Sequence, residues 1–188
     1  VIDSPYTLKE DVTLYAIWTV NKYNLSFDAN GATGDVPETI KEDYNSVVTL
    51  PDVGTLAKTG HTFAGWSEGD IVYKTGDEYT VKDSNVILTA IWDINQYTIV
   101  FNANGASGEV SEITAEYNSV VTLPDVGNLS KAGHKFAGWS LTEGGEVDYE
   151  AGNEYTVGDS DVTLYAIWNI QYTITWNVDG KETTSQVD

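Results

Sequence analysis

The chain contains two histidines, His61 and His134, and these are the first residues to test for catalytic or metal-binding chemistry. Each follows a glycine and is followed by a Phe-Ala-Gly-Trp-Ser segment, so the two occupy equivalent places in two copies of one pattern. A histidine pair that acted on one substrate or metal ion would have to lie in one site. We therefore interpret each as a local packing or turn residue, and we predict no catalytic residue.

Oxygen-bearing side chains recur in one loop of each copy, which raises the question of calcium binding. They are Asp28, Asn30 and Asp35 in one copy, and Asn102, Asn104 and Glu109 in the other. Neither set has the Asp-x-Asp-x-Asp-Gly density or the closing glutamate of a calcium loop. Gly31 and Gly34 do not form a phosphate loop, because no Lys-Ser/Thr follows them and no helix pattern begins there. We predict no metal site and no cofactor, with a calcium-stiffened array as the alternative.

Carboxylates and aromatic side chains are the remaining candidates for chemistry. Glycoside hydrolysis needs two carboxylates across one cleft, and small repeated modules offer no obvious large cleft. The 6 tryptophans and 12 tyrosines are enough to form sugar-stacking platforms. However, Trp66 and Trp139 recur on apolar faces, so we assign them to the core. An isopeptide bond is disfavoured because Gln96 replaces Lys22 in the next copy. We predict that the chain is not an enzyme.

The charge balance excludes several classes of partner. There are 29 acidic residues against 9 basic ones, all of them lysine, which gives a formal net charge of −20. Nucleic acids, anionic lipids and heparin-like polymers need clustered cations, so we expect none of them as partners. The spread of acid indicates a solvated, self-repelling surface. The absence of cysteine excludes disulfides and zinc–thiolate sites. No stretch approaches the ~20 apolar residues of a membrane span.

Internal repetition dominates the organisation of the chain. The sequence YNSVVTLPDVG occurs unchanged at residues 44–54 and 117–127, and DVTLYAIW occurs at 11–18 and 161–168, with a drifted copy that ends at Trp92. A period this long exceeds a solenoid rung and is sufficient for a small domain that folds alone.

The repeats set the expected boundaries. We expect the closing part of a truncated repeat at 1–20, complete repeats at 21–93 and 94–169, and the start of a variant repeat at 170–188. The linkers, at 19–22, 93–96 and 169–171, are short and are not rich in proline, glycine or serine. Such linkers hold neighbours close and limit their swing. We therefore expect a fragment of a longer rod.

Each repeat opens with a segment whose alternation predicts a half-buried strand, followed by an Asn-Gly turn. The apolar positions of the opening segment are Tyr23, Leu25 and Phe27 in the first copy, and Tyr172, Ile174 and Trp176 in the last. A second strand is expected from about Glu38 to Tyr44, with Ile40 and Tyr44 facing inward. SVVTLP predicts a third, which ends at a proline. The stretch DVGTLAKTG has room for one short helical turn at most.

The second half of the repeat also reads as β structure. HTFAGWS is strand-like, and the glycines before its tryptophans, Gly65 and Gly138, suggest a bulge or a close backbone approach. The closing LYAIW segment alternates as well. Its Leu-Ala-Trp face, which is Leu14, Ala16 and Trp18 in the first copy, is expected to be core.

Taken in order, these motifs resemble the Listeria–Bacteroides repeat, which is related to the B repeat of the internalins. They are the Y-x-[LI]-x-F opening, the Asn-Gly turn, VTLP, G-H-x-F-x-G-W and the closing VTLYAIW. The resemblance covers essentially the whole chain, except that NVDGKETTSQVD at the end resembles a shorter variant unit. It implies a β-grasp-like module that occurs in tandem on bacterial surfaces, between a ligand-binding head and a cell-wall anchor. It brings no catalytic residues with it.

We thus predict a mainly β, elongated array of tandem small β-grasp-like modules. The predicted function is a non-enzymatic stalk or spacer of an extracellular, wall-attached bacterial surface protein, monomeric, with neighbouring repeats as its partners. The alternative is an adhesin that binds a host protein or glycan. Buried tryptophans would favour the spacer, whereas an exposed aromatic row such as Tyr15 with Tyr165 would favour binding.

Overall fold

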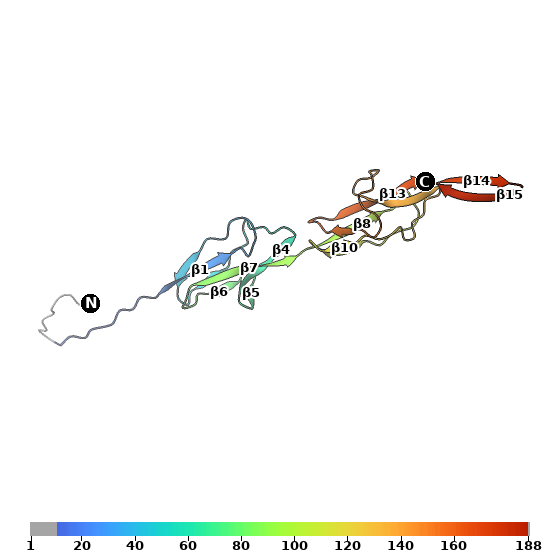
Figure 1. The fold of residues 1–188 in the computed structure, drawn as a ribbon. Coiled ribbons are helices and arrows are strands. Elements are labelled where there is room, and N and C mark those ends of the chain that lie inside the picture. The colour runs from blue at the N-terminus through green and yellow to red at the C-terminus, as the bar shows by residue number, and fades with distance from the viewer. Residues whose placement is uncertain (1–10, 188) are drawn as a thin grey trace.

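The computed structural model describes residues 11–187, and all of its regular elements are strands. Residues 1–10, which belong to the expected truncated repeat, lie outside the described part. Figure 1 shows two strand-built bodies that follow one another along the chain, with a hairpin beyond the second. The mainly β, tandem architecture is confirmed. The finer β-grasp assignment stays a prediction, because no helix packs on a sheet within residues 11–187.

The first repeat, whose strands run from Lys22 to Ile94, forms a five-stranded sheet in the order β2-β1-β7-β4-β5. Its strands are β1 (Lys22–Asp28), β2 (Ile40–Asp43), β3 (Val47–Thr49), β4 (His61–Glu68), β5 (Ile71–Tyr73), β6 (Glu78–Thr80) and β7 (Val86–Ile94). The opening strand β1 and the closing strand β7 lie in parallel at the centre. β3 and β6 form a separate antiparallel pair. The repeat is therefore closed by its first and last strands.

The second repeat, whose strands run from Gln96 to Ile170, has the same plan with one strand fewer in its sheet, whose order is β11-β13-β8-β9. Its strands are β8 (Gln96–Asn102), β9 (Ile113–Glu116), β10 (Val120–Thr122), β11 (His134–Ser140), β12 (Glu154–Thr156) and β13 (Val162–Ile170). The loop after Trp139 is longer than the loop after Trp66. Here a single bridge between Trp139 and Tyr149 stands where the first repeat has β5.

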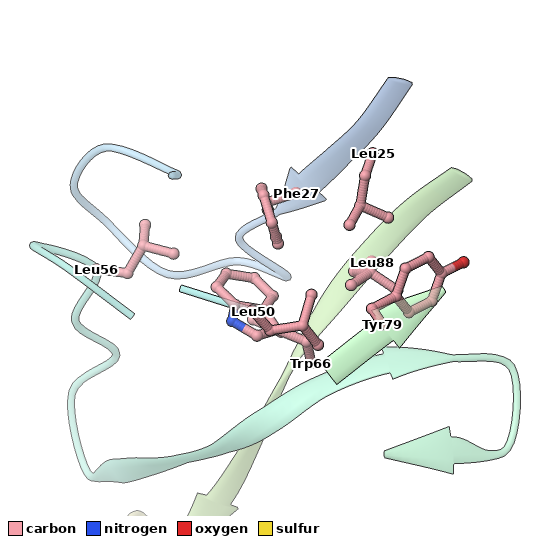
Figure 2. Packing of buried hydrophobic residues seen from close by; sticks show 8 residues of the cluster. Leu25, Phe27, Leu50, Leu56, Trp66, Tyr79 and Leu88 are labelled. Atoms are coloured by element: carbon pink, nitrogen blue, oxygen red, sulfur yellow. The ribbon is translucent and has the colours of Figure 1, made fainter. Parts of the chain in front are cut away.

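Each repeat has its own core, built from equivalent residues. In the first it comprises Leu25, Phe27, Leu50, Leu56, Trp66, Tyr79, Leu88 and Ala90. Figure 2 shows the Trp66 ring lying among the leucines of this cluster. Trp66 and Trp139 are both 0% exposed, which confirms their assignment to the core. Full burial of an aromatic side chain makes it a main contributor to the stability of a domain this small.

The predicted turns and bulges are confirmed by the backbone. Asn30 and Asn104 adopt positive φ values of 50° and 51°, as Asn-Gly turns require. The ladder between β4 and β7 shifts register between Phe63 and Gly65. Gly65 has a φ of 148°, and a Cβ there would run into the carbonyl of Tyr73, so both the bulge and the close approach are present.

Four expectations about local structure are wrong. The last copy of the opening segment forms β14 (Tyr172–Val178), but this strand is exposed rather than half-buried because it pairs only with β15 (Lys181–Val187). Tyr44 does not face inward but is 52% exposed, because it lies beyond the end of β2 (Ile40–Asp43) at the edge of the repeat. DVGTLAKTG has turns and a bridge from Ala57 to Thr33, with no helical turn. Leu14 and Trp18 are 80% and 89% exposed, and residues 11–18 form no strand. The reason is that no strand among residues 11–187 pairs with this copy of the closing segment.

Candidate functional site

The histidines lie in equivalent turns at the start of β4 and β11. Nδ1 of His61 contacts the carbonyl oxygen of Thr59 at 2.8 Å, and Nδ1 of His134 contacts that of Ala132 at 2.9 Å. The sheets keep the two residues in separate repeats, so they do not form a pair. Residues 11–187 contain no group of three or more His, Cys, Asp or Glu side chains placed to hold a metal ion.

Two of the side chains weighed for calcium in each loop, Asp28 with Asn30 and Asn102 with Asn104, have structural hydrogen bonds. Asp28 Oδ1 accepts the Asn30 backbone N–H at 2.8 Å. The Asn30 side chain donates to the carbonyl of Ala90 on the closing strand at 2.9 Å. The second repeat repeats both bonds through Asn102, Asn104 and Ala166. These side chains therefore hydrogen bond the Asn-Gly turn to the closing strand.

The first repeat contains a polar trio, Glu68, Tyr79 and Lys82, that no local sequence motif predicts. Glu68 Oε2 accepts a hydrogen bond from the Tyr79 hydroxyl at 3.1 Å and one from Lys82 Nζ at 2.7 Å. Burial, with the Glu68 charge added, raises the pKa of the Tyr79 phenol well above its usual range. Leu141 and Gly158 replace the two charged residues in the second repeat, so this trio is not a property shared by the two repeats.

The junction between the repeats is built around Asn95. Its N–H donates to the Gly60 carbonyl at 2.9 Å, and its own carbonyl accepts the Tyr117 N–H at 2.8 Å. Its side chain accepts a 2.7 Å bond from the Thr62 hydroxyl and donates to the Tyr97 hydroxyl at 3.3 Å. One residue thus binds both sheets through its backbone and its side chain.

A ring contact covers the same junction. The Tyr117 ring lies edge-on to His61, with ring centroids 6.1 Å apart and an interplanar angle of 73°. It also lies against Gly60, so closely that a Cβ at that position would overlap the ring. Tyr44 is the equivalent residue of the first repeat and is exposed. Neither the contact nor the role of Gly60 was predicted, because the two residues belong to different repeats.

Beside Tyr44 the first repeat has a surface hollow of about 360 Å³. Its lining comprises Tyr44, Asn45, Thr80, Val81, Lys82 and Asp83. Tyr44 is also the one exposed aromatic residue between residues 21 and 169. Tyr15 is exposed in the incomplete copy, whereas Tyr165 is half-buried, so the two do not form an exposed aromatic row.

Lys22, the residue considered for an isopeptide bond, forms an ion pair with Asp43 at 2.9 Å. The hydrogen bond to Asp43 raises the pKa of Lys22. Both side chains are half exposed, and exposed pairs of this kind contribute little to stability. No helix within residues 11–187 has the length and apolar character needed to cross a membrane.

Comparison with known proteins matches both repeats to one family. The family model described as the Listeria-Bacteroides repeat domain matches residues 23–91 and 97–167. Two proteins of Evansella cellulosilytica are similar. One, named a Gly-rich membrane protein, is 38% identical over 95% of the chain. The other, named a membrane protein, is 39% identical over 87%.

Internalin H of Listeria monocytogenes is also similar, at 28% identity over 81% of the chain. The chain spans 21%, 24% and 28% of the lengths of these three relatives. Among solved structures, domains 3–4 of a streptococcal tandem-repeat surface protein align with 79% of the chain and 97% of their own length. Their identity is 14% and their TM-score 0.28.

Proposed function

Because the chain belongs to the Listeria-Bacteroides repeat domain family, we propose that it is a non-enzymatic stalk or spacer region of a bacterial cell-surface protein. The units would be the two complete repeats at 21–93 and 94–169, flanked by parts of further repeats, each a β-grasp-like module. The array would be extracellular and wall-attached in the longer protein, where it would hold a binding head away from the cell.

The observation that carries this proposal is the use of the recurring aromatics. Trp66 and Trp139 are fully buried, and the indoles of Trp92 and Trp168 donate to the carbonyls of Ala29 and Ala103. Each repeat therefore uses its large rings to close its own core. A module that bound sugars by stacking would instead leave rings in solvent.

The junction and the charge also support a spacer. The short junction is hydrogen bonded on both sides of Asn95, which opposes bending. The net charge of −20 discourages collapse of one repeat onto another. Both features favour an extended array with neighbouring repeats as its main partners.

Small-angle X-ray scattering of the chain in moderate salt tests the shape. A compact domain of this length has a radius of gyration near ~16 Å. We expect a clearly larger value and an elongated profile, because Figure 1 places the two repeats one after the other. A value near that of one compact domain would rule out the stalk.

The second candidate is an adhesin that binds a host protein or glycan. The exposed Tyr44 beside its hollow is the observation that favours it. Binding to a glycan array at micromolar affinity would support the adhesin, whereas the stalk predicts silence. Calorimetric titration with calcium separates the third possibility, because a saturable site with integral stoichiometry per repeat would indicate a calcium-stiffened array.

A further inference from the structure

The exposed face around Tyr44 in the first repeat is the counterpart of the face around Tyr117 that forms the junction between the two repeats. Tyr44 and Tyr117 begin identical YNSVVTLPDVG segments, and both follow the second strand of their repeat. Tyr117 packs on Gly60 and His61 of the preceding repeat. Tyr44 is exposed beside a hollow that lies on the equivalent face.

We propose that Tyr44 and the hollow beside it are a docking site for the Gly-His turn of another repeat of this type, and that this contact fixes the angle between successive repeats. The occupant would be a repeat joined at Asn21, in the place where the first repeat is joined at Asn95. The proposal concerns the joint and holds whether the array serves as a stalk or as an adhesin.

The backbone before Tyr44 is already arranged for this partner. The Asn21 carbonyl accepts the Tyr44 N–H at 2.8 Å, as the Asn95 carbonyl accepts that of Tyr117. Residues 11–18 repeat the closing-strand sequence, and the linker at 19–22 has the same length as the linker at 93–96. A preceding repeat would thus arrive in the same register as the first repeat does at the junction.

The linker length restricts the proposal to this end of the pair. The linker at 169–171 is one residue shorter than the other two. Successive residues of a strand face opposite sides, so a linker that is one residue shorter presents the opposite face of the next module to the preceding one. A Cβ at Gly133, the equivalent of Gly60, meets no atom within 4 Å. The face around Gly133 therefore differs from the face around Gly60.

This pair of glycines supplies a matched control. Gly60 and Gly133 have φ values of 68° and 70°, so alanine introduces the same backbone strain at both positions. Only Gly60 has a ring against it. Gly60→Ala should displace the Tyr117 ring and loosen the joint, whereas Gly133→Ala should leave the angle between the two repeats unchanged.

The test uses spin labels, for which a chain without cysteine is well suited. Cysteines placed at Lys41 and Thr114, exposed and equivalent positions on β2 and β9, report the distance between the repeats by double electron–electron resonance. We expect a narrow distribution that becomes about twofold broader in Tyr117→Ala, because weakly packed modules move relative to one another. Tyr117→Phe, Tyr44→Ala and Gly133→Ala should stay narrow.

A longer chain tests the docking site itself. Residues 21–94 are placed directly before residue 21, so that the new linker has the natural length, and the labels are moved to the Lys41 positions of the first two repeats. Tyr44→Ala in the middle repeat should now broaden the distance distribution between the labels about twofold, although the same substitution should not change the distribution in the parent chain. Silence in both chains, or a broad distribution in the unsubstituted long chain, would overturn the proposal. Proton–nitrogen spectra confirm that each variant is folded, and neither result bears on ligand binding.

Discussion

The octapeptide DVTLYAIW occurs twice in this chain and has two different structures. At residues 161–168 it forms most of β13, which lies between β8 and β11 in the sheet, and Leu164 is fully buried. At residues 11–18 it forms no strand, and Leu14 is exposed. Identical local propensity thus gives a strand in one place and none in the other. The strand is made by the sheet that receives it, since β preference mainly reflects packing on neighbours.

The comparison also explains why a repeat is the folding unit. The closing strand lies inside the sheet because it pairs in parallel with the opening strand of its own repeat and antiparallel with β11. Parallel pairing needs a long connection between the two strands, and in each repeat that connection contains all the other strands. The opening and closing strands can therefore pair only when the whole repeat is folded. Residues 11–18 pair with no strand among residues 11–187, and their apolar side chains are exposed.

Loss of the central ring should have the largest effect. Trp139→Ala should destabilise the second repeat by roughly 3–5 kcal/mol, because a fully buried ring is replaced by a cavity. Urea unfolding followed through the methyl resonances of each repeat measures the two transitions separately. Trp18→Ala is the control and should leave both midpoints unchanged. A wild-type midpoint in Trp139→Ala would mean that the ring does not support the core.

The same leucine in the two octapeptides provides the closest test. Leu164→Ala should cost about 2–5 kcal/mol in the second repeat, as buried Leu→Ala changes do. Leu14→Ala removes the same atoms from the same local sequence and should cost nothing measurable in the same urea experiment. Equal effects at the two positions would contradict the conclusion that the receiving sheet creates the strand.

The Asn-Gly turn that holds the closing strand is the next point to test. Asn104→Ala removes the 2.9 Å bond to Ala166 and places alanine at a positive φ of 51°. We expect a loss of about 1–3 kcal/mol in the second repeat. Asn104→Gly removes the bond but tolerates the backbone, so it should cost less. If glycine proved as costly as alanine, the φ requirement would not contribute.

Much of the fold was predictable because equivalent positions of the two repeats could be compared. Positions that stayed apolar in both copies identified the core around Trp66 and Trp139, and the glycines before them identified the bulges. Tyr44 was misplaced for a physical reason. It lies at the end of the first repeat, at the position equivalent to Tyr117, and alternation within one repeat cannot distinguish an inward face from an end face.

The remaining features depend on residues that are distant in the sequence. The contact between Gly60 and Tyr117 joins two different motifs, and the Glu68–Tyr79–Lys82 trio joins the end of β4 to the segment around β6. Neither is encoded by a local period or spacing. The loss of β5 in the second repeat follows from a longer loop, whose course the sequence does not specify.

The smallest expected effect is a difference between the two repeats in how much stability each loses at alkaline pH. Burial raises the pKa of both Tyr79 and Tyr155, and the Glu68 carboxylate adds to the shift only at Tyr79. The folded repeats therefore keep phenol protons that the unfolded chain loses near pH ~10. Above that pH the unfolded state binds fewer protons than the folded state, so stability is fully present below it and falls as the pH rises.

The first repeat should lose more stability than the second between pH 9 and pH 11, because its phenolate would form beside a carboxylate. Urea midpoints of each repeat, read from methyl resonances at both pH values, measure the difference. Tyr79→Phe should abolish most of the excess loss, and Tyr155→Phe should leave that loss in place. The raised pKa values of Lys22 and Lys82 also contribute to the loss in the first repeat, and this contribution is shared by the wild type and Tyr79→Phe, so that pair isolates the phenol. An equal loss of stability in the two repeats would show that burial alone, without the Glu68 charge, sets the pKa of the Tyr79 phenol.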